Sequence, residues 1–325
     1  GYPQAIGDID AVGIKLINAG KEITATQPIT REVLQALQEF AGVTGIHNPP
    51  AIATIRLFEQ MFPEIPLIGV FETGFHHNVP EPHRTYGIPE HLARRYGIEK
   101  LGFHGNSHRH SARRLKTLAP GARKIISCHL GSGSSICAVL DGRSFDISSG
   151  FTPQSGTIMS TRPGDIDAQV LTYLQEKAGL SWSELNRMLL TDSGLLGISG
   201  TSAEMWELEH FADKGDERAR LAIAVFVYQV KKHIGAYFAL MNGLEALSFT
   251  GGIGENDPKA REAICRNLES LGIVIDPTVN EVALGQEALI SSTRSLVPVW
   301  VIPADEESLV AEETYAFLLG KNVPS

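Results

Sequence analysis

The stretch KIISCHLGSGSSICAVLDGRSFDISSGFTP, residues 124–153, organises the rest of the chain. It begins with an apolar run of strand length, passes through the glycine- and serine-rich segment Gly131–Ser135, and continues into a second apolar run, Ile136–Leu140. Asp141-Gly142 then has the sequence of a tight hairpin turn. We therefore expect a β-hairpin whose loop presents backbone N–H groups, an arrangement that suits phosphate oxygens. A flexible hairpin tip without a ligand is the alternative.

The composition is that of a globular protein. The chain has 325 residues, 43% of them hydrophobic and 20% charged, and this length makes two domains the default expectation. A net charge of −9 argues against nucleic acid or an anionic membrane as the main partner. Three cysteines without CxxC spacing fit a reducing compartment, and no apolar run approaches the roughly 18 residues of a membrane span. We therefore expect a cytoplasmic protein, in which local cations would have to bind any anionic substrate.

Strand and helix patterns mix along the whole chain. Ile65–Phe71 and Ala246–Thr250 have the composition of buried strands, whereas Thr30–Phe40 has helical periodicity with Thr30 as its N-cap. Glu217–Met241 is the longest helical pattern, and its wide apolar stripe predicts a helix buried between layers. Because several strands lie in hairpins, we expect an α/β fold with mixed sheets flanked by helices.

Three glycine-rich strand exits favour a nucleotide-binding site. They are Gly131–Ser135, Gly197–Ser202 and Gly251–Asn256. None has the GxxxxGK[ST] sequence of a P-loop, and the last lacks the GxGxxG frame and acidic residue of a dinucleotide-binding fold. One such segment is weak support, but three in one chain favour a nucleotide site over coincidence.

Several charged residues are candidates for chemistry on an anionic substrate. Arg162 lies in a polar loop, where a guanidinium binds phosphate or carboxylate bidentately; a solvated surface arginine is the alternative. Glu72 ends one apolar strand, and Glu306 and Glu307 follow another. A carboxylate at such a position is costly without a partner, so two acids meeting across a cleft would hold Mg²⁺ through water. For Glu307, the start of the final helix is a rival explanation.

The histidines His104 and His108 have the i,i+4 spacing that holds a metal on a helix. However, Gly102, Gly105 and Asn106 argue against a helix here, and the thiol or carboxylate partners of a zinc site do not appear at fixed spacing. A hydrogen-bonding role for His104 beside a charged substrate is therefore the preferred prediction.

Taken together, these segments resemble the acetate kinase family, within the sugar kinase, Hsp70 and actin superfamily. The resemblance runs over nearly the whole chain, and GFHGNSH (102–108), STRPGDID (160–167) and FTGGIGEN (249–256) make it specific. Six further segments match, and all the segments follow the family's order. They are HNPP (47–50), VFETGFH (70–76), HLGSGSS (129–135), GFTPQSG (150–156), SGLLGISG (193–200) and IPADEES (302–308).

The resemblance implies two lobes, each with a mixed sheet and flanking helices, that close over ATP and Mg²⁺. Residues 1–74 with 308–325 would form the first lobe, and residues 75–307 the second lobe with the contact of a homodimer. The implied activity is reversible phosphoryl transfer between ATP and a short carboxylate, which yields an acyl phosphate. A largely hydrophobic acyl pocket would select the short chain.

The matched motifs also imply roles for single residues. Arg162 and His104, with Glu72, would act on the phosphoryl group in flight, because positioning and charge neutralisation do most of the work in phosphoryl transfer. Glu306 would bind Mg²⁺. The carboxylate substrate would be bound by Lys15, His47 and Arg162. The nucleotide would be bound by His129, Leu130, Gly131, Ser132, Gly133, Glu204, Met205, Trp206, Gly252, Ile253, Gly254, Glu255 and Asn256.

The chain departs from the family pattern at several of these positions. Lys15 stands where the family has an arginine, which exchanges a bidentate fork for a point charge. Glu72 stands in place of an aspartate, Ser132 of an asparagine, and Trp206 of an arginine, although Trp206 would still be able to stack on a base. The Asn-x-Gly-Ser-Ser-Ser phosphate hairpin of family members has no match in residues 1–20.

These departures lead us to expect a divergent family member with altered substrate choice or weak activity, with truncation at the N-terminus as a further, compatible explanation. A non-catalytic nucleotide-binding scaffold is the alternative of a different class. A kinase for a longer acid, such as propionate or butyrate, is the third possibility.

Overall fold

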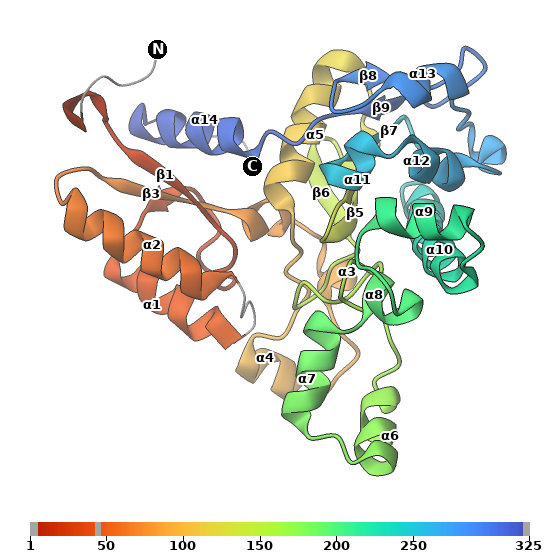
Figure 1. Ribbon diagram of the computed structural model, residues 1–325. Helices are drawn as coiled ribbons and strands as arrows, with labels where there is room; N and C mark the ends of the chain where they lie inside the picture. The colour runs from red at the N-terminus through yellow and green to blue at the C-terminus, as the bar shows by residue number, and fades with distance from the viewer. Residues whose placement is uncertain (1–5, 43–46, 321–325) are drawn as a thin grey trace.

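The computed structural model describes residues 6–42 and 47–320, and this part of the chain forms two sheets with helices around them (Figure 1). The smaller sheet has three strands in the order β1-β3-β2, and the larger has six in the order β6-β5-β4-β7-β9-β8. Parallel and antiparallel pairs occur in both sheets. The predicted α/β fold with mixed sheets flanked by helices is therefore confirmed.

The smaller sheet is built near the start of the described chain. β1 (Val12–Leu16) pairs in parallel with β3 (Leu67–Phe71), and the short β2 (Gln27–Pro28) pairs antiparallel with β3. Because side chains alternate between the two faces of a strand, neighbouring residues of β1 serve different layers. Leu16 packs into a core with α1 and α2, whereas a Cβ on Gly13 would lie 2.3 Å from Thr314 Oγ1 of α14.

Helices cover both faces of this sheet (Figure 1). α1 (Arg31–Glu39) and α2 (Asn48–Met61) lie on one side, and α14 (Glu306–Leu318) lies on the other, against β1 and β3. Thr30 is the N-cap of α1, as predicted, and its hydroxyl accepts from Val33 N at 3.4 Å.

The larger sheet is organised around the hairpin predicted from residues 124–153. β4 (Lys124–Leu130) and β5 (Ser134–Leu140) pair antiparallel along their whole length. The chain then turns at Asp141 and Gly142, whose φ angles of 53° and 80° are those of a tight hairpin turn, into β6 (Arg143–Ile147). The predicted strand, loop, strand, turn and strand are all confirmed.

The remaining strands of the larger sheet extend from the other side of β4. β7 (Ala246–Thr250) runs parallel to β4, and β9 (Val299–Val301) runs parallel to β7. β8 (Ala288–Leu289) closes this edge in antiparallel pairing with β9. β7, which enters this sheet from a distant part of the chain, therefore ends beside the hairpin tip, and β9 ends one strand farther out.

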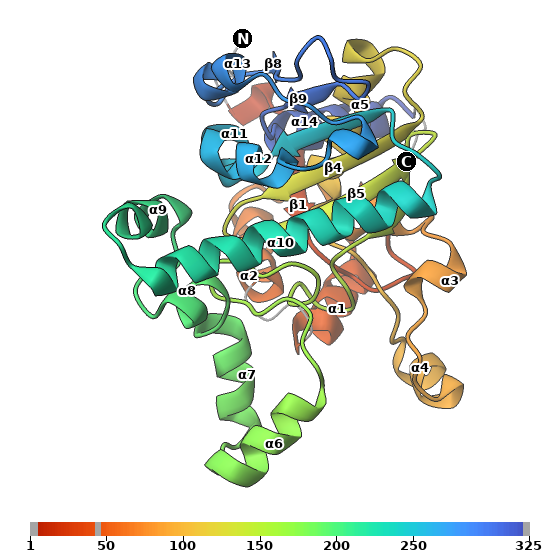
Figure 2. The same cartoon turned by 90° about the vertical axis from the view of Figure 1, so that its right-hand side faces the viewer.

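Two helices sandwich the larger sheet. α5 (Gly105–Leu118) packs on the face that carries Ile125 and Val139, and α10 (Glu217–Leu240) packs on the face that carries Ile126 and Ala138. Figure 2 shows α10 lying across β4 and β5 at the outside of the molecule.

The expectation that the long helix α10 is buried between layers is wrong. Leu221 and Tyr228 are 55% and 66% exposed, so its outer face is open to solvent. Only the positions from Ala219 to Tyr237 that recur every three or four residues are buried. Leu221 and Tyr228 widened the stripe in the sequence without taking part in the core, whereas Val225 and Phe238 are partly buried against it.

The other described helices are α3 (Glu81–Arg84), α4 (Glu90–Tyr96), α6 (Gln169–Ala178), α7 (Trp182–Thr191), α8 (Gly194–Ser199), α9 (Met205–Asp213), α11 (Gly251–Asn256), α12 (Pro258–Cys265), α13 (Pro277–Val282), η1 (Ile6–Asp8), η2 (Phe40–Gly42), η3 (Glu72–His76) and η4 (Glu269–Leu271). Within the described residues, none of the helices has the length and apolar character needed to cross a bilayer.

The division into two lobes stays a prediction. The smaller sheet lies within residues 12–71, and the last described helix, α14, packs on it. Residues 1–5, 43–46 and 321–325 of the predicted first lobe lie outside the described part of the chain.

Candidate functional site

The tip of the β4–β5 hairpin brings two predicted catalytic side chains to one point. A Cβ on Gly133 would lie 2.8 Å from Arg162 Nη2 and 2.9 Å from His104 Nε2, so a side chain here would displace one of them. Ser160 N donates to Ser132 O at 3.2 Å and ties the Arg162 loop to the same tip. The guanidinium and the imidazole therefore meet beside the glycine-rich loop.

Arg162 is partly buried and carries a charge that has little compensation. Its Nη1 donates to Pro153 O at 2.6 Å. Burial lowers its pKa, and among the described residues no carboxylate lies within 4.0 Å of its guanidinium. A solvated surface arginine is therefore the wrong interpretation, and the side chain is available to an anion.

His104 is held in an unusual conformation. It is the N-cap of α5, with a left-handed backbone at φ 57° and ψ 27°. Such a conformation costs on the order of 1–3 kcal/mol for a residue other than glycine, and it is typical of functional sites. The ring stacks on His129 with centroids 4.3 Å apart, and Nδ1 lies 2.8 Å from Ser135 Oγ.

The argument from glycine against a helix at residues 102–108 is wrong, because α5 begins at Gly105 and contains His108. A Cβ on Gly105 would lie 1.8 Å from Glu72 O, so this glycine allows two segments to approach rather than breaking the helix. His108 bonds two serine hydroxyls, and the described residues contain no cluster of three or more His, Cys, Asp or Glu that could hold a metal.

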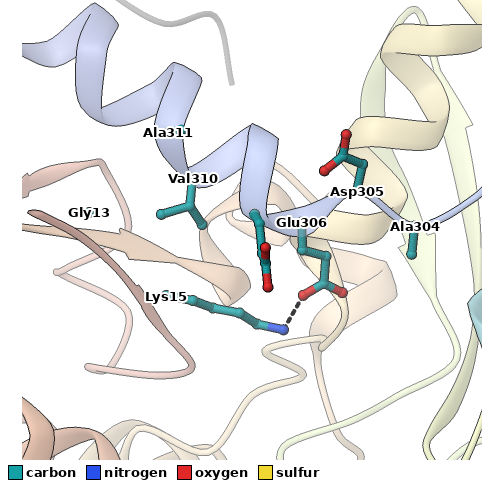
Figure 3. A pocket seen from close by; sticks show the side chains of 8 residues that line it. Gly13, Lys15, Ala304, Asp305, Glu306, Val310 and Ala311 are labelled. Carbon is teal, nitrogen blue, oxygen red and sulfur yellow. Dashed lines mark hydrogen bonds and ion pairs between the residues drawn. The ribbon is translucent and has the colours of Figure 1, made fainter. Parts of the chain in front are cut away.

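Two acidic residues, Glu72 and Glu306, face this corner from the other side, with Lys15 between them. Lys15 of β1 makes an ion pair with Glu306 of α14, and its Nζ lies 3.8 Å from Glu72 Oε2. Figure 3 shows Lys15 reaching toward Glu306 at the start of α14. Lys15 and Glu306, but not Glu72, border a cavity of about 680 Å³, which is lined by Gly13, Lys15, Ala304, Asp305, Glu306, Glu307, Val310 and Ala311.

Glu72 is the most perturbed of these acids. It is 3% exposed, and burial raises its pKa to about 7, with Lys15 opposing that rise and Glu306 adding to it. The backbone N–H of His104 also donates to this carboxylate. Glu72 therefore connects the Lys15–Glu306 ion pair to the His104 end of α5.

The two groups of residues form one site. Burial, and then the charges of Arg162 and Lys15, lower the pKa of His47, so His47 lies within electrostatic reach of both cations. Burial lowers the pKa of His129 to about 4. Glu306 acts against this change, and Lys15 adds to it. Lys15, Glu72, Glu306 and His104 thus lie around the same corner, between β1, η3, α5 and α14, and Arg162 approaches His104 at Gly133.

A second cavity, of about 370 Å³, opens on the other side of the hairpin tip. Its lining includes eight of the predicted nucleotide-binding residues: Gly131, Ser132, Glu204, Met205, Trp206, Gly252, Ile253 and Asn256. Residues that the sequence reasoning missed complete it: Ser160, Glu209, Asp257, Pro258, Lys259 and Glu281. Met205 and Glu209 have i,i+4 spacing on α9, and this helical spacing was the available signal.

The structure does not bring the other predicted nucleotide-binding residues into this lining, namely His129, Leu130, Gly133, Gly254 and Glu255. Glu255 Oε1 instead accepts from Gly251 N at 2.7 Å and from Ala304 N at 2.8 Å. This carboxylate therefore joins the start of α11 to the segment before α14.

The cavity wall farther along α9 and α12 is acidic. Burial, with the neighbouring Asp257, raises the pKa of Glu209 to about 7, and burial also raises the pKa of Asp257. Lys259 Nζ lies 3.2 Å from Asp213 Oδ2. Carboxyl groups accept hydrogen bonds from amino and hydroxyl groups, whereas the glycine-rich tip offers N–H donors.

Two of the three predicted glycine-rich strand exits do follow strands, and one does not. Gly251–Asn256 follows β7, but it forms the short helix α11 rather than an open loop. Gly197–Ser202 follows no strand, because its first residues belong to α8. α8 instead supports the arginine loop, since Leu195 N donates to Met159 O at 2.9 Å.

Sequence comparisons connect this chain to known enzymes. A family model described as the Acetokinase family matches residues 2–312. The acetate kinase of Carboxydothermus hydrogenoformans is 41% identical over 324 residues, which cover 99% of this chain and 81% of that protein. The acetate kinase of Thermoanaerobacterium thermosaccharolyticum is 43% identical over 318 residues, which cover 97% of this chain and 79% of that protein.

Solved structures show the same similarity. Porphyromonas gingivalis acetate kinase superposes with a TM-score of 0.92 at 39% identity, covering 98% of this chain and 80% of that one. A propionate kinase from Francisella tularensis superposes with a TM-score of 0.89 at 38% identity, covering 95% and 79%. The similarity thus includes both sheets and the site between them.

Proposed function

This chain belongs to the acetokinase family, and from that premise we propose that it is a carboxylate kinase. It would transfer a phosphoryl group reversibly between ATP and acetate or a similar short-chain carboxylate. One observation carries the proposal: Arg162 and His104 converge at Gly133, between a cavity of nucleotide size and the Lys15–Glu306 pair.

The convergence suits the charge that develops during phosphoryl transfer. The transferred group spreads negative charge over its three equatorial oxygens, and donors placed around it lower the barrier. The Arg162 guanidinium and the His104 imidazole come from different segments of the chain, and both approach Gly133. The charges of Arg162 and Lys15 both reach His47, and these three residues would orient the carboxylate substrate for attack.

Mg²⁺ is the metal that this donor set fits. Magnesium is bound by one or two carboxylates together with substrate phosphates, and Glu306 and Glu72 supply two carboxylates. Glu306 already binds a cation in this structure, the Lys15 ammonium group. Glu306 would hold Mg²⁺ when ATP is bound, and the metal would supply charge neutralisation at the phosphates.

The nucleotide would lie along the cavity of about 370 Å³. Its phosphates would face the backbone of Gly131, Ser132 and Gly133, and its ribose and base would face the acidic wall formed with Glu209. Trp206 is 68% exposed on the lining of this cavity, where its indole is free to stack on a base.

The two-lobe arrangement, the cytoplasmic location and the homodimer are parts of the same proposal. A net charge of −9 supports a small-molecule substrate rather than a nucleic acid or a membrane as the partner. The dimer rests on the resemblance to the family, and sedimentation equilibrium of the purified chain tests it.

The test of the function is a hydroxamate assay for acyl phosphate with ATP, Mg²⁺ and carboxylates of two, three and four carbons. We expect product with at least one of them, and the preferred chain length separates an acetate kinase from a kinase for longer acids. Calorimetric ATP binding without ADP production on any carboxylate would instead identify a nucleotide-binding scaffold. The similarity to an acetate kinase over 99% of this chain favours the enzyme.

A further inference from the structure

A series of buried hydrogen bonds runs from His104 away from the cavity and into the larger sheet. Ser135 Oγ lies 2.8 Å from His104 Nδ1 and also 2.8 Å from His108 Nε2. His108 Nδ1 lies 3.0 Å from Ser127 Oγ. Ser127, Ser135 and His108 are each 0% exposed, so one buried hydroxyl is shared between two imidazole rings.

The surroundings of both rings favour the neutral form of imidazole. Burial, and then the neighbouring His129, holds the pKa of His104 well below its ordinary value. Burial, and then His76, does the same for His108. A neutral imidazole has one N–H donor and one bare nitrogen, and a serine hydroxyl has a single proton.

Two arrangements use the single Ser135 proton in a bond of this series; if Ser135 instead accepted from both rings, that buried proton would have no partner within the series. In the first, Ser135 donates to His104 Nδ1 and accepts from His108 Nε2, and Ser127 donates to His108 Nδ1. His104 then carries its proton on Nε2. In the second arrangement each of these bonds is reversed, and His104 Nε2 is bare. The tautomer of His104 is therefore coupled to that of His108 through one oxygen atom.

The ligand decides between the two arrangements. His104 Nε2 is the atom that approaches Gly133 beside Arg162 Nη2, so it faces the position of an anion. An anionic oxygen needs a donor there, since a bare nitrogen would repel it. The ring itself cannot turn freely, because it stacks on His129.

We propose that His108, acting through the Ser135 hydroxyl, is a positioning residue that holds His104 in the tautomer with its proton on Nε2 when an anion is bound. The inference rests on the proposed function, in which that anion is the phosphoryl group. It assigns a role to the second histidine of the 102–108 segment and to a serine of β5.

The first test reads the tautomer directly. In uniformly ¹⁵N-labelled protein with inorganic phosphate as the probe, long-range ¹H–¹⁵N correlation spectra show whether Nδ1 or Nε2 carries the proton, and a His104→Gln variant identifies the signals. We expect a single Nε2–H tautomer for His104 in the natural sequence and a mixture in Ser135→Ala. A single Nε2–H tautomer in both proteins overturns the proposal. This measurement needs no turnover, so a failure of the proposed activity does not affect it.

The second test is kinetic. Ser135→Ala is expected to lower kcat about tenfold, less than the roughly 10²–10³-fold loss when a donor is removed outright, with both KM values within about twofold. His108→Leu is expected to match it, whereas His108→Gln retains a donor near the Nε2 position and recovers most of kcat.

The matched control is Ser111→Ala. Ser111 is also 0% exposed on α5, but its hydroxyl bonds Ser248 Oγ at 2.7 Å, outside this series. We expect its kcat to stay within about twofold of the natural value. An equal loss in Ser111→Ala and Ser135→Ala, or an equal loss in both His108 variants, contradicts a positioning role. If His108→Leu does not fold, the two Ser135→Ala measurements decide alone.

Discussion

Arg162 and Arg109 have the same type of side chain but differ in how their charge is compensated. Arg109 of α5 is 6% exposed, and its guanidinium donates to Glu313 of α14 at 2.7 Å. It also lies 5.7 Å from the centre of the Phe75 ring. Arg162 is buried in part as well, but its recorded protein partner is the carbonyl oxygen of Pro153.

The difference lies in the compensation of charge. Burying a charge is costly unless an opposite charge or hydrogen bonds offset it. Glu313 offsets the charge of Arg109 within the fold. Among the described residues no carboxylate does the same for Arg162, whose charge is therefore available to an anion from solution. A buried arginine with its carboxylate in place holds elements together, whereas one without a carboxylate is available to an anionic ligand.

The largest expected effect is on catalysis at Arg162. Arg162→Ala should lower kcat for acyl phosphate formation by about 10³-fold or more, because an arginine that neutralises a transferring phosphoryl group is worth about 10³–10⁵. The free energy of unfolding should stay equal or rise, since the variant removes a poorly compensated charge. The hydroxamate assay and urea denaturation measure the two quantities.

Arg162→Lys is the matched variant, because it keeps the charge and loses the bidentate fork. An intermediate kcat would show that both charge and geometry contribute. Turnover of Arg162→Ala equal to that of the natural protein would remove this residue from the mechanism.

The second prediction concerns stability at Arg109. Arg109→Met should lower the free energy of unfolding by about 3 kcal/mol, because it leaves Glu313 buried with fewer partners. Urea denaturation by circular dichroism measures this change. Arg123→Met is the control: Arg123 is 69% exposed in its pair with Asp141, so its loss should lower the free energy of unfolding far less than Arg109→Met does. Equal effects of the two substitutions would mean that burial of the pair does not matter.

The pH dependence of stability should follow Glu313. Burial alone would raise the pKa of Glu313, but Arg109, Thr26 and Arg113 lower it below its ordinary value. A carboxyl group with a lowered folded-state pKa stabilises the protein above its unfolded-state pKa, and this stabilisation disappears as the pH falls through the folded-state value. In Glu313→Gln, the loss of unfolding free energy between neutral and acidic pH should therefore be smaller than in the natural protein. An unchanged slope would exclude Glu313 as a source of the acid sensitivity.

The smallest expected effect is at Trp206. Trp206→Ala should raise the KM for ATP about fivefold to tenfold with little change in kcat, since stacking on a base contributes roughly 1–3 kcal/mol. Trp182→Ala is the control, because Trp182 is similarly exposed, at 60%, but lies on α7, outside the cavity lining. ATP titrations with steady-state turnover distinguish the two variants, and equal KM values would contradict base stacking.

Much of the local structure could be predicted from the sequence. The β4–β5 hairpin, the turn at Asp141 and the N-cap at Thr30 depend on a few neighbouring residues and their backbone preferences. The candidate residues were available from their motifs, and their roles followed from the family resemblance. Gly251–Asn256 was predicted as a strand exit, and only its helical conformation was missed.

The tertiary structure decided which of these residues meet. Gly133 approaches both His104 and Arg162, and the acidic wall at Glu209 depends on α9 and α12 packing together. The Ser135 hydroxyl bonds two histidines about thirty positions away in the chain. The physical reason is that propensity and periodicity act over a few residues, whereas distances between side chains on different elements are set by how those elements pack. By itself, the sequence determined the elements and the chemistry available; the packing of the two sheets and their helices decided where that chemistry is concentrated.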